Sequence, residues 1–107
     1  MALAVGTAGL MPVPLLAQQS LFLMFPYDYL GLPEGERRHY VLGVLDARLF
    51  ALTGTANYAT LSRCIVDKGV DGFLRFIREE LIPRDNYAVV PMPIVVEQAG
   101  RELCGID

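Results

Sequence analysis

The sequence has no tryptophan, a single histidine and only two cysteines among its 107 residues. Basic residues are also few, since nine Lys and Arg stand against twelve Asp and Glu, a formal net charge of −3. Arg37-Arg38 is the longest basic run, so the chain lacks the concentrated positive surface that nonspecific nucleic-acid binding requires. A charged fraction of 20% and an aromatic fraction of 9% also argue against disorder.

The amino-terminal segment is the least polar part of the chain, because no charged residue precedes Asp28. Residues 1–17 are typical of a secretory leader, and Ala17 before Gln18 suits cleavage, which would deliver residues 18–107 to the periplasm as a single domain. A membrane span is less favourable, because two prolines interrupt the run and about 20 apolar residues are needed. No Lys or Arg precedes the run. An upstream start, an uncleaved membrane anchor, or an apolar segment folded into the domain therefore stay open.

The two cysteines, Cys64 and Cys104, belong to neither a CxxC motif nor a metal-ligand cluster. Behind a secretory leader, an isolated pair predicts one disulfide. A disulfide between them would close a loop of about 40 residues and stabilise the fold by about 4 kcal/mol. Such a contribution suits a domain with a small core. The alternative is two buried free thiols in a cytosolic protein.

Helical periodicity of the apolar residues predicts an all-α fold, a compact bundle of four to five short helices with one disulfide. The apolar stripes expected to face the core are Val41, Val44, Leu45, Leu49 and Leu52; Ala59, Leu61, Cys64 and Ile65; Val70, Phe73, Leu74, Ile77 and Leu81; and Met92, Val95, Val96, Ala99 and Leu103. Pro33 favours a helix start, and Gly54 and Pro83 favour helix ends. Tyr87 to Val90 could form a strand, but no second strand is expected, so we predict an extended connection there. The expected elements are a helix over 19–25, a turn at 26–28, helices over 33–52, 56–66 and 70–81, a turn at 67–69, and a last helix from about 91 to 104.

Candidate catalytic residues are sparse. His39 lies on the charged side of a predicted helix, and neither serine stands in a nucleophile elbow. The close carboxylate pairs are Asp67 with Asp71 and Glu79 with Glu80, and a solvated helix face explains them. Glu79 and Glu80 are adjacent on a helix, so their side chains diverge by about 100°. We therefore expect no enzyme activity and no cofactor or metal. Four tyrosines in connections or near helix ends are candidates for partner binding or for capping the core: Tyr27, Tyr29, Tyr58 and Tyr87.

One internal motif is unusual, with Tyr40, Gly43 and Asp46 spaced three residues apart in a predicted helix. Glycine within a helix costs up to about 1 kcal/mol relative to alanine, so we expect a second helix to cross closely at Gly43. A leucine at that position should then destabilise the fold strongly. Asp46 is expected to cap a neighbouring helix or to bond Tyr40.

The order of these features resembles the small periplasmic helical family that includes the type VI secretion amidase immunity proteins. The matching pieces are Tyr40, Gly43, Asp46 and Ala47; Cys64 with residues 66–70; Leu81 with Pro83; and residues 95–104. The resemblance implies a stoichiometric inhibitor that binds a secreted peptidoglycan amidase and blocks its cleft without a cofactor.

Two other classes stay open, a small periplasmic acid-stress chaperone and an accessory subunit of an envelope complex. The sequence also leaves open whether the protein forms a homodimer.

Overall fold

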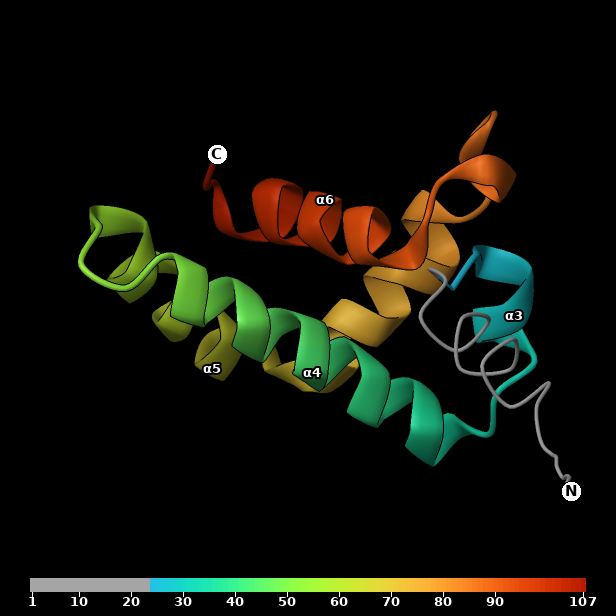
Figure 1. Ribbon diagram of the computed structural model, residues 1–107, viewed down its shortest axis with the longest axis horizontal. Helices are drawn as coiled ribbons and strands as arrows, with labels where there is room; N and C mark the ends of the chain where they lie inside the picture. Colours follow the sequence, from blue (N-terminus) through green and yellow to red (C-terminus); the bar gives the residue numbers. More distant parts are fainter. Residues whose placement is uncertain (1–23) are drawn as a thin grey trace, which may run out of the picture.

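The computed structural model describes residues 24–107, which form four α-helices and two shorter helical segments without any strand (Figure 1). The predicted all-α bundle is confirmed. The predicted leader at 1–17 lies outside the described residues, as do positions 19–23 of the first predicted helix. The elements are α3 (Pro26–Leu30), α4 (Glu34–Ala51), α5 (Ala56–Phe76), the π-helical η1 (Ile77–Leu81), the 3-10 segment η2 (Tyr87–Val89) and α6 (Met92–Cys104).

Helix α3 replaces the turn predicted at 26–28. Pro26 is the first residue of this helix, a position where its missing N–H and fixed φ cost nothing. The Asp28 carboxylate accepts a hydrogen bond of 3.2 Å from the backbone N–H of Phe25, which satisfies one of the free donors at the helix start. Proline therefore begins a helix here, whereas we expected it to end one.

Helix α5 contains the predicted break at 67–69, although the two predicted helices join into one bent element. Gly69 has φ 73° and ψ 158°, a backbone conformation open almost only to glycine. The kink divides α5 into a first arm, residues 56–68, and a second arm, residues 70–76. The second arm continues into η1, whose wider turn is marked by the 2.9 Å hydrogen bond from the N–H of Ile82 to the carbonyl of Ile77.

The segment before α6 was predicted to be extended, and η2 shows that this is wrong for residues 87–89. Without a strand partner the backbone forms local bonds instead, such as the 3.0 Å bond from the N–H of Val90 to the carbonyl of Tyr87. Helix α6 then begins at Met92, whose N–H donates to the carbonyl of Met24 at 2.6 Å. Gly105, in the left-handed conformation, ends α6 and turns Ile106 back into the core.

The core lies where α4, α5 and α6 pack on one another. The predicted apolar stripes supply most of it, but Ala59, predicted to face inward, is exposed. Within residues 24–107, no helix is both long and apolar enough to cross a membrane. The buried hydrophobic residues are Tyr29, Val41, Leu45, Leu52, Leu61, Cys64, Phe73, Ile77, Leu81, Met92, Val95, Val96, Ala99 and Ile106.

Candidate functional site

The predicted disulfide is confirmed. Cys64 lies on the buried side of the first arm of α5, and Cys104 is the last residue of α6. Their Cα atoms are 5.6 Å apart, within the usual range for a disulfide. The bond therefore joins α5 to α6 through two cysteines that are 40 positions apart in the sequence.

The residues considered for catalysis are surface residues. His39 is exposed on α4. Asp71 forms an ion pair of 2.5 Å with Arg38, and Glu79 forms one of 3.0 Å with Arg78. In the part of the chain that the structure describes, no three His, Cys, Asp or Glu side chains form a group that could hold a metal ion.

The residues of the motif lie in different environments: Tyr40 packs against the core, and Gly43 and Asp46 are exposed. Tyr40 packs against Tyr29, with ring centroids 6.2 Å apart and planes inclined by 60°. Gly43 is exposed, and a Cβ atom placed on it would have no neighbour within 4 Å among the described residues. The predicted close helix crossing is therefore wrong. Gly43 follows Val41, a core residue, by two positions, which places it about 200° round the helix and away from the core.

Asp46 is exposed on the same helix as Gly43. Its carboxylate has no hydrogen-bond partner among residues 24–107, so the structure shows neither the expected cap nor the expected bond to Tyr40. Asp46 and Gly43 are thus residues of the solvent face of α4, with no packing role in the described fold.

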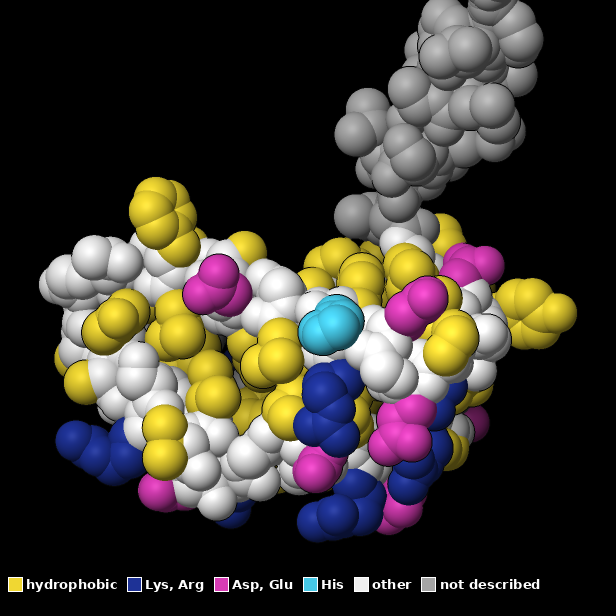
Figure 2. Space-filling model, turned by 90° about the horizontal axis from the view of Figure 1, so that it is seen from below, with side chains coloured by type: hydrophobic (Ala, Val, Ile, Leu, Met, Phe, Trp, Pro, Cys, Tyr) yellow, Lys and Arg dark blue, Asp and Glu magenta, His cyan; other side chains and the backbone are white. Residues whose placement is uncertain are grey.

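Exposed apolar side chains mark a second feature of α4 and α5. Leu42 and Phe50 on α4 keep 39% and 83% of their surface exposed, and Tyr58 and Val66 on the first arm of α5 keep 42% and 80%. Figure 2 looks onto the face formed by these helices: hydrophobic side chains gather in its left half, and most acidic and basic side chains lie in its right half. We call these four residues the apolar surface.

The four candidate tyrosines have different environments. Tyr27 and Tyr58 are exposed, Tyr29 is buried, and Tyr87 is half-buried with the Arg84 guanidinium 5.9 Å from its ring centroid. Tyr58 is therefore the only one of them in the apolar surface, and Tyr29 belongs to the core.

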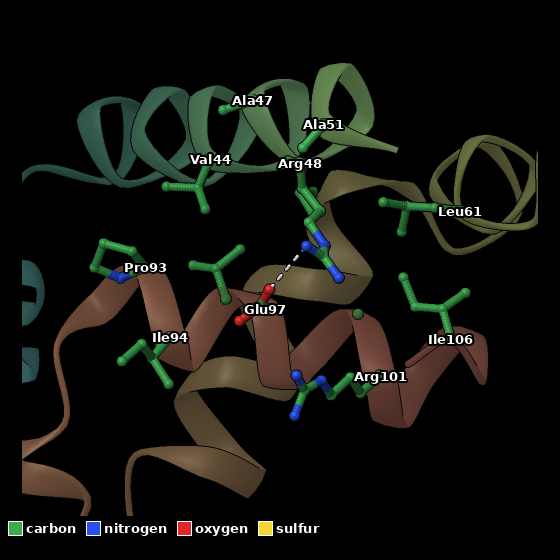
Figure 3. Close-up of a pocket in the computed structure, with 13 residues that line it drawn as sticks. Val44, Ala47, Arg48, Ala51, Leu61, Pro93, Ile94, Glu97, Arg101 and Ile106 are labelled. Carbon is green, nitrogen blue, oxygen red and sulfur yellow. Dashed lines mark ion pairs between the residues drawn. The ribbon is translucent and has the colours of Figure 1, made fainter. Parts of the chain in front are cut away.

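A groove of about 290 Å³ separates α4 from α6, and its walls are mostly apolar (Figure 3). The small side chains of Ala47 and Ala51 leave this space on the α4 side. Arg48 reaches across the groove to Glu97 on α6 at 3.2 Å, and it donates a further bond of 3.0 Å to the backbone carbonyl of Asp107. This bridge ties α4 to α6 and to the carboxyl end of the described chain.

A comparison of the chain with family models, with curated proteins and with solved structures finds no match. The resemblance to the type VI secretion immunity proteins therefore stays a prediction. Phe50 and Val66 were not predicted as surface-binding candidates, although both are large apolar residues that fall outside the predicted core stripes. Large apolar residues at positions outside a core stripe were the signal in the sequence that could have identified the apolar surface.

Proposed function

We propose that this chain is a non-catalytic periplasmic protein that binds and inhibits a peptidoglycan amidase, as the type VI secretion immunity proteins do. The observation that carries the proposal is Gly43, an exposed glycine in the middle of an 18-residue helix. Glycine there costs up to about 1 kcal/mol of helix stability, and no contact within the described fold uses the missing Cβ. A partner backbone that approaches α4 closely would use it.

The residues near Gly43 on α4 have the chemistry of a binding surface. Phe50 is a large aromatic side chain held in solvent, and burying it against a partner would contribute about 2 kcal/mol. Leu42 adds apolar area, and Asp46 offers a carboxylate to a donor on the partner. An aromatic anchor with polar groups around it is the usual composition of an interface hot spot.

The disulfide supports the proposed compartment. The bond between Cys64 and Cys104 would persist in an oxidising environment such as the periplasm and would be reduced in most cytosols. It also explains how a domain of this size keeps apolar side chains on its surface and stays folded, because the disulfide stabilises it independently of the core.

The proposal is tested by mixing the purified protein with each peptidoglycan amidase encoded beside its gene and measuring the release of cleaved peptidoglycan. We expect inhibition that is complete at one protein per enzyme. Phe50→Ala should weaken binding at least tenfold. The matched control is Tyr27→Ala, because Tyr27 is equally aromatic, is 88% exposed and lies on α3. Failure to inhibit any of these amidases, or an equal loss in the two variants, would contradict the proposal.

A second candidate function, the acid-stress chaperone, is favoured by the ion pairs that join separate elements. Arg38–Asp71 links α4 to α5, and Arg48–Glu97 links α4 to α6. Ion pairs between helices weaken in strong acid, because carboxylates in general lose their charge there, and weaker links between helices favour exposure of the core. Each exposed pair contributes at most about 1 kcal/mol, so this candidate ranks second. Suppression of the aggregation of a client protein at pH 3 but not at pH 7, without any amidase partner, would support it.

A further inference from the structure

A polar pocket of about 280 Å³ lies where α3, the start of α4, the second arm of α5 and η1 meet. It is distinct from the apolar surface and from the groove, with which it shares no lining residue. We call it the arginine pocket. Its polar lining residues are Tyr29, Glu34, Arg37, Asp71, Arg75 and Arg78.

The charges that line the arginine pocket do not balance. Three arginines and two acidic residues line it, and two of these five are already in ion pairs: Asp71 with Arg38 at 2.5 Å, and Arg78 with Glu79 at 3.0 Å. Arg75 has no ion-pair partner within 4 Å in residues 24–107. Positive charges that line one pocket repel one another, and an anion between them would relieve the repulsion.

One guanidinium is held in place by the backbone. Arg37 donates a hydrogen bond to the carbonyl of Leu32, in the turn between α3 and α4. Arg78 is linked to Glu79 on the same segment at 3.0 Å. Two of the three cations therefore have contacts that restrict their side chains before any ligand enters, which lowers the entropy that binding would have to offset.

Tyr29 provides a neutral donor at the base of the arginine pocket. Only 1% of this residue is exposed, yet it lines the pocket, and its hydroxyl has no hydrogen-bond partner among the described residues. Burial raises the pKa of Tyr29, and the nearby charges of Arg37 and Arg78 partly offset that rise. The phenol is therefore protonated at neutral pH and lies close to two guanidinium groups.

We propose that the arginine pocket binds a small oxyanion, a phosphate or a carboxylate, between Arg75 and Arg78 with the Tyr29 hydroxyl as a further donor. Guanidinium groups present paired N–H donors that match two oxygens of one carboxylate or phosphate. Glu34 also lines the pocket and reduces its net positive charge, which weakens but does not cancel the attraction of an anion. This site is independent of the proposed amidase binding.

The test is a titration of the full chain with sodium phosphate and, separately, with sodium succinate, each at constant ionic strength set with sodium chloride. Binding is followed by the NMR signals of the arginine side-chain N–H groups. We expect saturable shifts for at least one probe, at Arg75 and Arg78 but not at Arg63. Arg75→Gln should weaken binding at least fivefold, and Tyr29→Phe, which removes only the hydroxyl, should weaken it severalfold.

Arg63→Gln is the matched control, because Arg63 is exposed on the first arm of α5 and its loss changes the net charge equally. A response to phosphate alone assigns the pocket to phosphate ligands, and a response to succinate alone assigns it to carboxylates. Two results would overturn the proposal: no saturable shift with either probe, or an equal loss of affinity in Arg63→Gln and Arg75→Gln. Far-ultraviolet circular dichroism confirms that each variant is folded before it is titrated.

Discussion

The apolar surface and the arginine pocket both include residues of α4 and α5, to which the pocket adds α3 and η1, and they differ in almost every chemical property. Helix α4 shows the contrast by itself, because its first six residues carry two acids, two arginines and His39. Its remaining twelve residues carry only Asp46 and Arg48 as charged side chains. Val41 and Leu45 face the core from the middle of the helix. One inward stripe is enough to hold α4 in the bundle, so the outward positions at its two ends are free to differ.

The two surfaces also differ in what maintains them. The apolar surface exposes Phe50 and Val66 to water at an energetic cost, and the first arm of α5 beneath it is joined to α6 by the disulfide. The arginine pocket instead depends on the kink at Gly69, which directs the second arm of α5 and its arginines toward α3 and α4. Covalent closure therefore supports one surface, and backbone conformation shapes the other.

Removal of the disulfide should have the largest effect. Replacing Cys64 and Cys104 by alanine together should lower the free energy of unfolding by about 4 kcal/mol, because the unfolded chain regains the freedom of a 40-residue loop. Urea denaturation followed by circular dichroism measures it, and reduction of the unmodified protein should give the same shift. A loss below about 1 kcal/mol would show that the apolar surface does not depend on covalent closure.

The kink at Gly69 should have the next largest effect. Gly69→Ala places a side chain at φ 73° and ψ 158°, which should cost about 2 kcal/mol of stability. A Cβ there has no neighbour within 4 Å among the described residues, so the cost is one of backbone conformation alone. Gly35→Ala is the control, because Gly35 is equally open and has a helical conformation. Unchanged urea midpoints and unchanged oxyanion binding would together refute the role of the kink.

Substitution of Gly43 should change the free energy of unfolding in the opposite direction to substitution of Gly69. Gly43→Ala should raise the free energy of unfolding by up to about 1 kcal/mol, because alanine is the better helix former and the site is open. The same variant should weaken binding of the partner, whereas Gly35→Ala should leave binding unchanged. Thermal melting and the inhibition assay measure the two effects. A destabilised Gly43→Ala variant would restore the close helix crossing that we expected from the sequence.

The sequence was sufficient to predict those features that depend on local pattern. Pro33, the apolar stripe of α4 and the pair Cys64 and Cys104 each led to a feature that the structure confirms. The wrong prediction at Gly43 has a clear cause. A glycine within a helix indicates that another group approaches the helix closely, but it does not show whether that group is a helix of the same chain or a partner. The core position of Val41 already placed Gly43 on the outer side, and this information was in the sequence.

The arginine pocket could not be predicted in the same way. Its residues come from α3, α4, the second arm of α5 and η1, and the φ of Gly69 determines how these elements meet. Helical spacing shows that Asp71 and Arg75 on the second arm and Arg78 in η1 share one face, but it does not show which helix that face meets. Only the tertiary packing shows that this face meets α3 and the start of α4.

The smallest expected effect concerns an ion pair that belongs to neither surface. Arg84 donates two hydrogen bonds, of 2.7 and 2.8 Å, to the carboxylate of Glu102 on α6. These bonds, together with one from Gln98, lower the pKa of Glu102 to about 2. Because the folded pKa lies below the unfolded value of about 4.3, the pair stabilises the protein fully above pH 5. That contribution is lost as the pH falls toward 2.

Glu102→Gln should therefore lower the free energy of unfolding slightly at pH 7, where the pair contributes, and flatten its dependence on pH between about 5 and 2. Glu79→Gln is the control, because the Glu79–Arg78 pair is also exposed but joins neighbouring residues of one segment. Urea denaturation at a series of pH values measures both variants. If the unmodified protein instead unfolds steeply near pH 3 and Glu102→Gln prevents it, the acid-stress function becomes the better proposal.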